Sequence, residues 1–194
     1  NWFANNHKTV YILVNNAGYG SIDDCMDPNH KASEETVKTT LNTNVRGTIE
    51  FTEKMLPHLA ENGRIITIGS VMGTLRMQGE GVRKKLSDPT LDKKKLFELI
   101  DTFESLALKH EHTKQDFSNS IYNTSKAFIH AYNRYVLPSL LKGDQTCFVV
   151  HPGWVKTDLG GSQAPGNIED SVVSTMAVTN LSLEESKKYS GKYF

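Results

Sequence analysis

Tyr122 and Lys126 lie four residues apart in a segment that is expected to be helical. Residues at this spacing share one helix face, so the phenol and the ammonium can point into one site. A free phenol has a pKa of about 10, and a nearby cation favours its ionised form. Such a phenol can give a proton to a carbonyl oxygen or take one from an alcohol. Exposed Tyr–Lys pairs at this spacing also occur by chance, so the pair alone does not identify an enzyme.

Ser70 lies in a second segment with candidate chemistry, Gly69–Gly73, directly after a predicted strand. Its hydroxyl could donate a hydrogen bond to the substrate oxygen that Tyr122 serves, and the glycines keep the loop tight. The alternative is an ordinary turn serine. A serine hydrolase is disfavoured, because the residues around Ser70 do not form G-x-S-x-G.

Asn15-Asn16-Ala17-Gly18 is the third such segment, and it also follows a predicted strand. In open α/β sheets, ligands bind at the carboxyl ends of the strands. Small residues at that position let a flat ring or a ribose approach the backbone closely. Asn and Gly also form turns, so a strand-to-loop turn is the alternative.

Three short apolar runs predict the strands that carry these segments: Thr9–Val14, Arg64–Ile68 and Thr146–Val150. We expect the first of them to be buried on both faces, because it is rich in β-branched and aromatic residues. Strands that alternate with helices indicate an α/β fold, with a parallel sheet wrapped on both faces.

Apolar residues at helical spacing predict three helices, over Ser33–Leu59, Tyr122–Leu137 and Ile168–Thr179. Ser33 is the expected N-cap of the first helix, which we expect to be interrupted near Gly47.

Residues 74–120 separate a strand from the following helix by almost fifty residues. Within this insert, Leu96, Ile100 and Phe103 fall on one helical face. We therefore expect an amphipathic helix near Asp92–His110 that packs on the body of the protein and covers part of it.

The composition favours one domain without a nucleic-acid or membrane partner. The 194 residues carry 22 basic and 22 acidic side chains, so there is no overall basic field for a phosphate backbone. The apolar runs are far shorter than the roughly 20 residues that cross a bilayer. Two cysteines outside any C-x-x-C favour a reducing compartment, and we expect a cytoplasmic location. His110 and His112 lack a third ligand at a recognisable spacing, so no metal site is expected.

Together, the segments resemble the short-chain dehydrogenase/reductase superfamily from about Thr9 to the end of the chain. Asn15–Gly18 matches the N-N-A-G of that family, Ser70 its catalytic serine, and Tyr122 with Lys126 its Y-x-x-x-K. Two further segments add to the likeness: Pro152–Asp158 matches P-G-x-V-x-T-D, and Asn44 falls where the family keeps a helix asparagine.

The separation of 52 positions from Ser70 to Tyr122 makes the chain similar to the monomeric carbonyl reductases and their plant relatives. In those proteins the inserted helices cover the surface that other members use to form dimers. The resemblance therefore implies a Rossmann-like doubly wound parallel sheet and a monomer.

The resemblance also implies a reaction, the NADPH-dependent reduction of a small-molecule ketone or aldehyde to an alcohol. Tyr122 would protonate the oxygen and Ser70 would polarise it. Lys126 would lower the pKa of Tyr122 and bond the ribose hydroxyls, and Asn44 would hold a water that relays the proton. NADP(H) is favoured by the subfamily, and NAD(H) is possible.

The ligand contacts that the resemblance implies fall on four segments. The cofactor would meet Asn15, Ala17, Gly18, Tyr122, Lys126, Pro152, Gly153, Val155 and Thr157. The substrate would meet Ser70, Met72 and Trp154, although Trp154 could equally be structural.

The family begins with a strand and a T-G-x-x-x-G-x-G turn, neither of which is in this sequence. We interpret residues 1–194 as the C-terminal part of a single domain that is incomplete at its N-terminus, with Asn1–Lys8 at the end of a helix. This interpretation predicts an unpaired apolar edge beside Thr9–Val14 and no activity of the 194-residue chain alone. The alternatives are an NAD-dependent alcohol or steroid dehydrogenase, and an inactive truncated paralogue.

Overall fold

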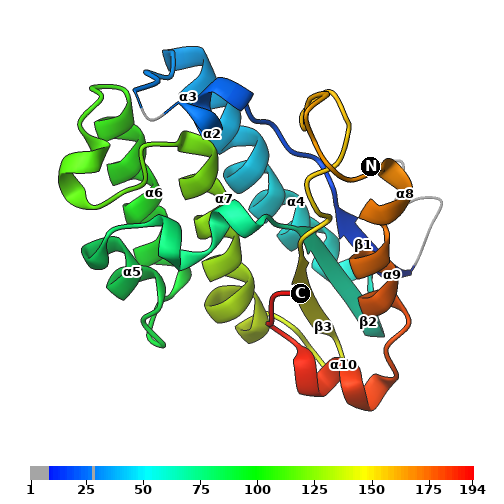
Figure 1. Cartoon of the computed structure of the whole chain (residues 1–194). Coiled ribbons are helices and arrows are strands. Elements are labelled where there is room, and N and C mark those ends of the chain that lie inside the picture. Colours follow the sequence, from blue (N-terminus) through cyan, green and yellow to red (C-terminus); the bar gives the residue numbers. More distant parts are fainter. Residues whose placement is uncertain (1–8, 28) are drawn as a thin grey trace.

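Three parallel strands form the sheet of the computed structural model, which describes residues 9–27 and 29–194. The strands are β1 (Val10–Asn15), β2 (Leu59–Ile68) and β3 (Thr146–Val150), and β2 lies in the middle (Figure 1). All three predicted strands are confirmed. The helix end expected at Asn1–Lys8 lies outside the described residues.

The helix that was expected over Ser33–Leu59 consists of α3 (Glu34–Leu41), a π-helical turn (Asn42–Gly47) and α4 (Thr48–Met55). Ser33 is its N-cap as predicted, since Ser33 Oγ accepts a hydrogen bond from Thr36 N at 3.1 Å. The predicted interruption at Gly47 is confirmed: a Cβ there would lie 2.7 Å from the Asn42 carbonyl oxygen. The predicted end at Leu59 is wrong.

Pro57 explains why that helix stops early. It lies in a short 3₁₀ turn (Leu56–His58) after α4, and a proline removes the N–H that would continue an α-helix. Leu59 is therefore free to begin β2, where it pairs with Val10 of β1.

Seven further helices complete the described part of the chain. They are α2 (Ile22–Met26), α5 (Glu80–Leu86), α6 (Lys93–Ala107), α7 (Ile121–Ala131), α8 (Ile168–Ser171), α9 (Val173–Thr179) and α10 (Leu183–Tyr189). The segment predicted as one helix over Tyr122–Leu137 is α7 followed by a π-helical turn (Tyr132–Val136) and a 3₁₀ turn (Leu137–Ser139). Throughout the described ranges, every helix falls short of the length and apolar character that a membrane span requires.

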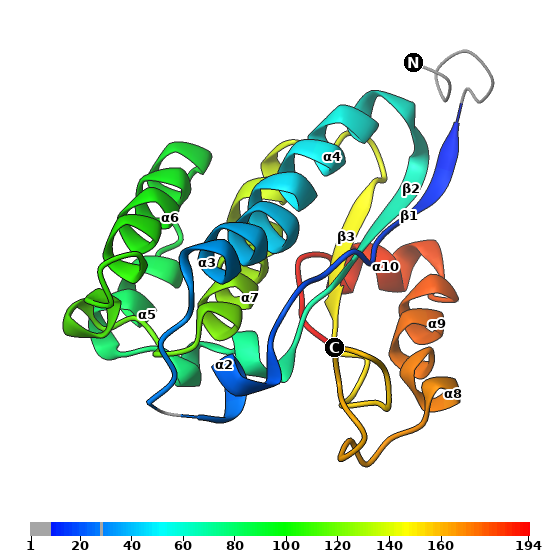
Figure 2. The same ribbon diagram turned by 90° about the horizontal axis from the view of Figure 1, so that it is seen from above.

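The helices lie on both faces of the sheet. Helices α3, α4 and α7 cover one face, and α9 and α10 lie on the other (Figure 2). Successive residues of β2 point to opposite faces, so Ile65 joins the larger core with Phe128, while Ile66 joins a smaller one with Phe148 and Val178. The predicted α/β fold is confirmed.

Strand β1 forms one edge of the sheet among the described residues. Its side chains Tyr11, Ile12 and Val14 are 66%, 42% and 41% exposed. The expectation of a strand buried on both faces is therefore wrong here, because β1 pairs with β2 alone and no described element covers these side chains. Among the described residues, β1 is therefore an edge strand with exposed apolar side chains, as expected.

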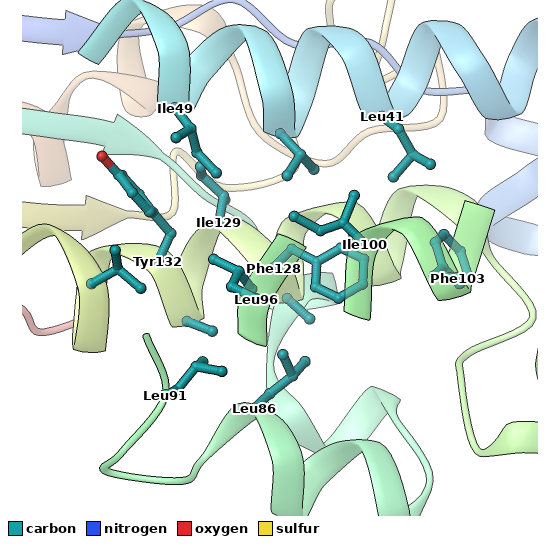
Figure 3. Packing of buried hydrophobic residues seen from close by; sticks show 14 of the residues in the cluster. Leu41, Ile49, Leu86, Leu91, Leu96, Ile100, Phe103, Phe128, Ile129 and Tyr132 are labelled. Atoms are coloured by element: carbon teal, nitrogen blue, oxygen red, sulfur yellow. The ribbon is translucent and has the colours of Figure 1, made fainter. Parts of the chain in front are cut away.

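Helix α6 of the insert packs on the body as predicted. Its side chains Leu96, Ile100 and Phe103 are fully buried, and Figure 3 shows them among labelled side chains of α3, α5 and α7, including Leu41, Leu86 and Phe128. At the surface, Arg46 on the π-helical turn pairs with Asp101 at 2.8 Å and with Glu104 at 2.7 Å. Surface pairs contribute about 1 kcal/mol or less, so the apolar contacts hold α6 in place.

Asp24 of α2 caps the N-terminus of α7. Its carboxylate is 3% exposed and accepts hydrogen bonds from Ile121 N at 3.0 Å, from Tyr122 N at 2.9 Å and from Ser120 Oγ at 2.8 Å. Ser120 Oγ in turn accepts from Asn123 N at 3.1 Å. The first three amides of α7 therefore all have acceptors, and a negative charge lies at the positive end of the helix dipole.

Asp24→Asn should destabilise the fold by about 2 kcal/mol, because it replaces charge-assisted hydrogen bonds and turns an NH₂ group towards N–H donors. Asp23→Asn is the matched control, since Asp23 is the exposed neighbour on the same helix and its change should stay within about 0.5 kcal/mol. Urea unfolding of both variants measures the difference. Equal stability of the two variants would contradict the capping role.

Candidate active site

Tyr122 and Ser70 meet where α7 passes the carboxyl end of β2. A hydrogen bond with Ser70 lowers the pKa of Tyr122, but burial raises it by more, so the net shift is upward. Desolvation disfavours the phenolate, and the phenol is therefore protonated at neutral pH. In this state Tyr122 can give a proton, which is the role of a general acid.

Lys126 lies one turn along α7 from Tyr122. Its Nζ donates a hydrogen bond to the Ile68 carbonyl oxygen at 2.7 Å and lies 5.7 Å from the centre of the Tyr122 ring. Burial lowers the pKa of Lys126 to about 8. The expectation that Lys126 lowers the pKa of Tyr122 is not met, because burial dominates both groups and the Nζ is directed to the β2 carbonyl.

Gly69 and Gly73 let α7 come this close to the end of β2. A Cβ on Gly69 would lie 2.4 Å from both His130 Nε2 and Val149 Cγ1, and a Cβ on Gly73 would lie 2.6 Å from Lys126 Cβ. Real Cβ atoms do not make contacts this short. The two glycines thus meet a steric requirement, in agreement with the tight loop that the sequence suggested.

Ser70 is held from two sides in this loop and is 6% exposed. Its Oγ accepts a hydrogen bond from Met72 N at 3.1 Å, and its own N–H donates to His130 Nε2 at 3.3 Å. The Met72 side chain is half-buried, and its predicted contact with substrate stays a prediction.

Asn44 projects from the π-helical turn, a local structure that is frequent at functional sites. Its Oδ1 accepts from Tyr19 N at 2.7 Å, while its Nδ2 donates to the Tyr19 carbonyl at 2.8 Å and to Ser125 Oγ at 3.0 Å. Both amide hydrogens are therefore used by the protein. Asn44 joins Tyr19, the residue after the Asn15–Gly18 segment, to α7, and its expected role in holding a water stays a prediction.

The Asn15–Gly18 segment begins with a buried side chain, Asn15, and ends in exposed residues. Asn15 Nδ2 donates to Thr52 Oγ1 at 2.8 Å and to Thr67 Oγ1 at 3.3 Å, which ties β1 to α4 and β2. Gly18 and Ala17 are exposed. A Cβ built on Gly18 would lie 3.7 Å from both Lys126 Nζ and Asn44 Oδ1, so this backbone is brought next to the buried ammonium.

The loop after β3 carries the remaining predicted cofactor residues, Pro152, Gly153, Val155 and Thr157. All four are half-buried or exposed. The loop begins beside Ser70, because Gly69 N donates to the Val150 carbonyl at 2.8 Å.

Trp154 and Thr157 both close this loop on itself. Trp154 Nε1 donates to the Gly160 carbonyl at 2.7 Å, and Thr157 Oγ1 accepts from Gly160 N at 3.0 Å. Trp154 thus has the structural contact that was one of its two expected roles, and its contact with substrate stays a prediction.

Gly20 lies between Tyr122 and the loop after β3. A Cβ on Gly20 would lie 2.7 Å from Tyr122 Cδ2 and 3.2 Å from Leu159 Cδ1. Gly20, which follows β1, therefore lies against both the Tyr122 ring and Leu159 of the loop after β3.

Three residues with clear places in the site were missed by sequence reasoning. His130 could have been found, because it continues the face of Tyr122 and Lys126 by one more turn. Gly20 and Asp24 had no local signal, since the groups that they contact lie about a hundred residues further along the chain.

Among the described residues, no group of three or more His, Cys, Asp or Glu side chains could hold a metal ion. His112 packs edge-on against Phe103 and donates from Nε2 to the Asn119 carbonyl at 3.0 Å. This histidine is a structural residue of the insert.

Known proteins resemble this chain in sequence over most of its length. The sequence model described as short chain dehydrogenase matches residues 1–82. Carbonyl reductase [NADPH] 1 of Sus scrofa is 29% identical over 164 residues, which cover 81% of this chain and 55% of the relative. The Macaca fascicularis protein of the same name is 28% identical over 179 residues, 89% of this chain and 63% of the relative. The chain thus spans less than two thirds of these relatives.

Solved structures resemble it in fold. Salutaridine reductase from Papaver somniferum superposes with a TM-score of 0.84 at 19% identity, over 100% of this chain and 75% of that one. The shared fold, the sequence relatives and the order of Ser70, Tyr122 and Lys126 agree with one another. The chain is similar in sequence to the short-chain dehydrogenases and to the carbonyl reductases, and it shares the fold of salutaridine reductase.

Proposed function

We propose that the native protein reduces a small-molecule ketone or aldehyde to an alcohol with NADPH. One observation carries this proposal: Ser70 lies close enough to the buried, protonated phenol of Tyr122 to influence its pKa, and Lys126 lies one helical turn away. The names of the sequence relatives support both the reaction class and NADPH as the cofactor.

The residues around Lys126 fit the ribose and nicotinamide end of such a cofactor. Ala17 and Gly18 offer exposed backbone, and a Cβ built on Gly18 would be in van der Waals contact with Lys126 Nζ at 3.7 Å. The buried Lys126 ammonium uses one hydrogen bond on Ile68 and has two donors left for ribose hydroxyls. When bound, a nicotinamide cofactor supplies the hydride for the carbonyl carbon.

The protein's own part in the reaction is to move one proton and stabilise one oxygen. Ser70 Oγ donates a hydrogen bond to the carbonyl oxygen, which polarises the carbonyl and holds it near Tyr122. Tyr122 Oη then gives its proton to that oxygen as negative charge develops there. Lys126 lies one helical turn away, where its Nζ would hold the ribose hydroxyls of the cofactor.

Tyr122→Phe should lower kcat about 100-fold or more, with little change in KM, because the variant keeps the ring and loses the acidic proton. Tyr135→Phe is the matched control, since Tyr135 is half-buried in the turn after α7 and should leave kcat unchanged. Both are assayed in the native protein by the decay of NADPH absorbance with a test ketone. A loss of less than about tenfold for Tyr122→Phe would rule out the acid role.

The affinity for NADPH should decrease above pH 8. Lys126 loses its proton near this pH in the free protein, whereas the raised pKa of Tyr122 keeps the phenol protonated. If the ammonium holds the ribose, Kd increases by up to about tenfold per pH unit above 8, until the pKa of Lys126 in the complex is reached. Fluorescence titration of NADPH between pH 7 and pH 9.5 measures this slope.

Lys126→Arg is the control for that slope, because a guanidinium stays charged over the whole range. A Kd of the wild type that is flat across pH 8 would contradict the role of the Lys126 charge. The same slope in the Lys126→Arg variant would assign the titration to another group.

We also propose that the native protein is a monomer. The support is the insert, whose α6 buries Leu96, Ile100 and Phe103 in the larger core with Phe128 of α7. An α7 face covered in this way is not available to a second copy. Analytical ultracentrifugation should give the mass of one chain, and a stable dimer would contradict the covering role.

A further inference from the structure

His130 contacts the catalytic loop from the same helix face that carries Tyr122 and Lys126. The three residues are spaced four apart, so one face of α7 presents all of them. His130 Nε2 accepts a hydrogen bond from the backbone N–H of Ser70 at 3.3 Å. The acid, the ammonium and the support of the serine thus come from a single helix.

The hydrogen bond from Ser70 requires one form of the imidazole. A nitrogen that accepts must be unprotonated, so the single hydrogen of the neutral ring lies on Nδ1. Burial, followed by the charges of Lys126 and His151, lowers the pKa of His130 to about 3. The ring is therefore neutral, and able to accept, across the pH range in which enzymes of this kind work.

The imidazole is fixed on two sides. Gly69 leaves room for it, since a Cβ at that position would lie 2.4 Å from Nε2. Its other side packs on the Tyr193 ring, with ring centres 4.9 Å apart, and Tyr193 is paired with Val149 of β3. A ring held in this way can define the position of the Ser70 backbone.

We propose that His130 is a positioning residue, whose neutral Nε2 holds the Ser70 backbone so that the Ser70 hydroxyl faces Tyr122. The kinetic consequence rests on the proposed function, whereas the bond to Ser70 does not. Because both partners of the Tyr122–Ser70 pair are held by α7, their separation depends on one rigid helix.

Two substitutions separate this role from simple packing. His130→Gln keeps an acceptor at a similar reach and loses the ring, whereas His130→Phe keeps a ring on Tyr193 and loses the acceptor. A positioning role predicts that the His130→Gln variant retains most of kcat. The His130→Phe variant should lower kcat about tenfold or more with KM little changed, since small misplacements at a reacting centre are costly. A packing role predicts the reverse order.

The bond itself is tested by ¹⁵N NMR of the native protein, without turnover. The His130 ring should show the tautomer with hydrogen on Nδ1, and the Ser70 amide resonance should shift in His130→Phe more than in His130→Gln. His112 is an internal control in the same spectrum, because it donates from Nε2 to a carbonyl and should show the opposite tautomer.

Each result either supports or overturns the inference. Hydrogen on His130 Nε2, or a Ser70 amide that is equally perturbed in both variants, would overturn it. So would a His130→Phe variant that is as active as the wild type. If the wild type reduced no carbonyl compound, the proposed function would fail, while the tautomer and the Ser70 amide would still decide whether His130 holds the loop.

Discussion

The contact between α7 and the carboxyl end of β2 is the constraint on which the rest of the site depends. Lys126 Nζ donates to the Ile68 carbonyl, which joins the helix to the last residue of the central strand. Gly69 and Gly73 make this approach possible, since a Cβ on either would overlap side-chain atoms of α7. Ser70 lies between the two glycines, so the loop that permits the approach also presents the hydroxyl to the helix.

Burial, more than charge, sets the protonation states in this contact. It raises the pKa of Tyr122 and lowers those of Lys126 and His130, so each group is biased towards its neutral form. A neutral phenol has a proton to give, and a neutral imidazole has a lone pair to accept with. The same desolvation therefore prepares an acid at one end of the helix face and an acceptor at the other.

The sequence predicted the strands, the insert helix and the order of Ser70, Tyr122 and Lys126, because these features have local periodicity or a family motif. It did not predict the cap of α7, since nothing near Ile121 indicates that its acceptor is Asp24. Neither did it predict that the pKa of Tyr122 is raised. The i,i+4 spacing indicates only that a cation is near, whereas desolvation depends on the complete packing around the ring. Long-range contacts and burial are the two quantities that a single sequence does not display.

The cap on α7 also bears on how the protein folds. Asp24 and the amides of Ile121 and Tyr122 are separated by 97 and 98 residues, so the cap closes a long loop whose entropy must be overcome first. Contacts of such sequence separation slow folding. The N-terminus of the helix that carries Tyr122 therefore depends on a contact of high sequence separation, contributed by the short helix α2.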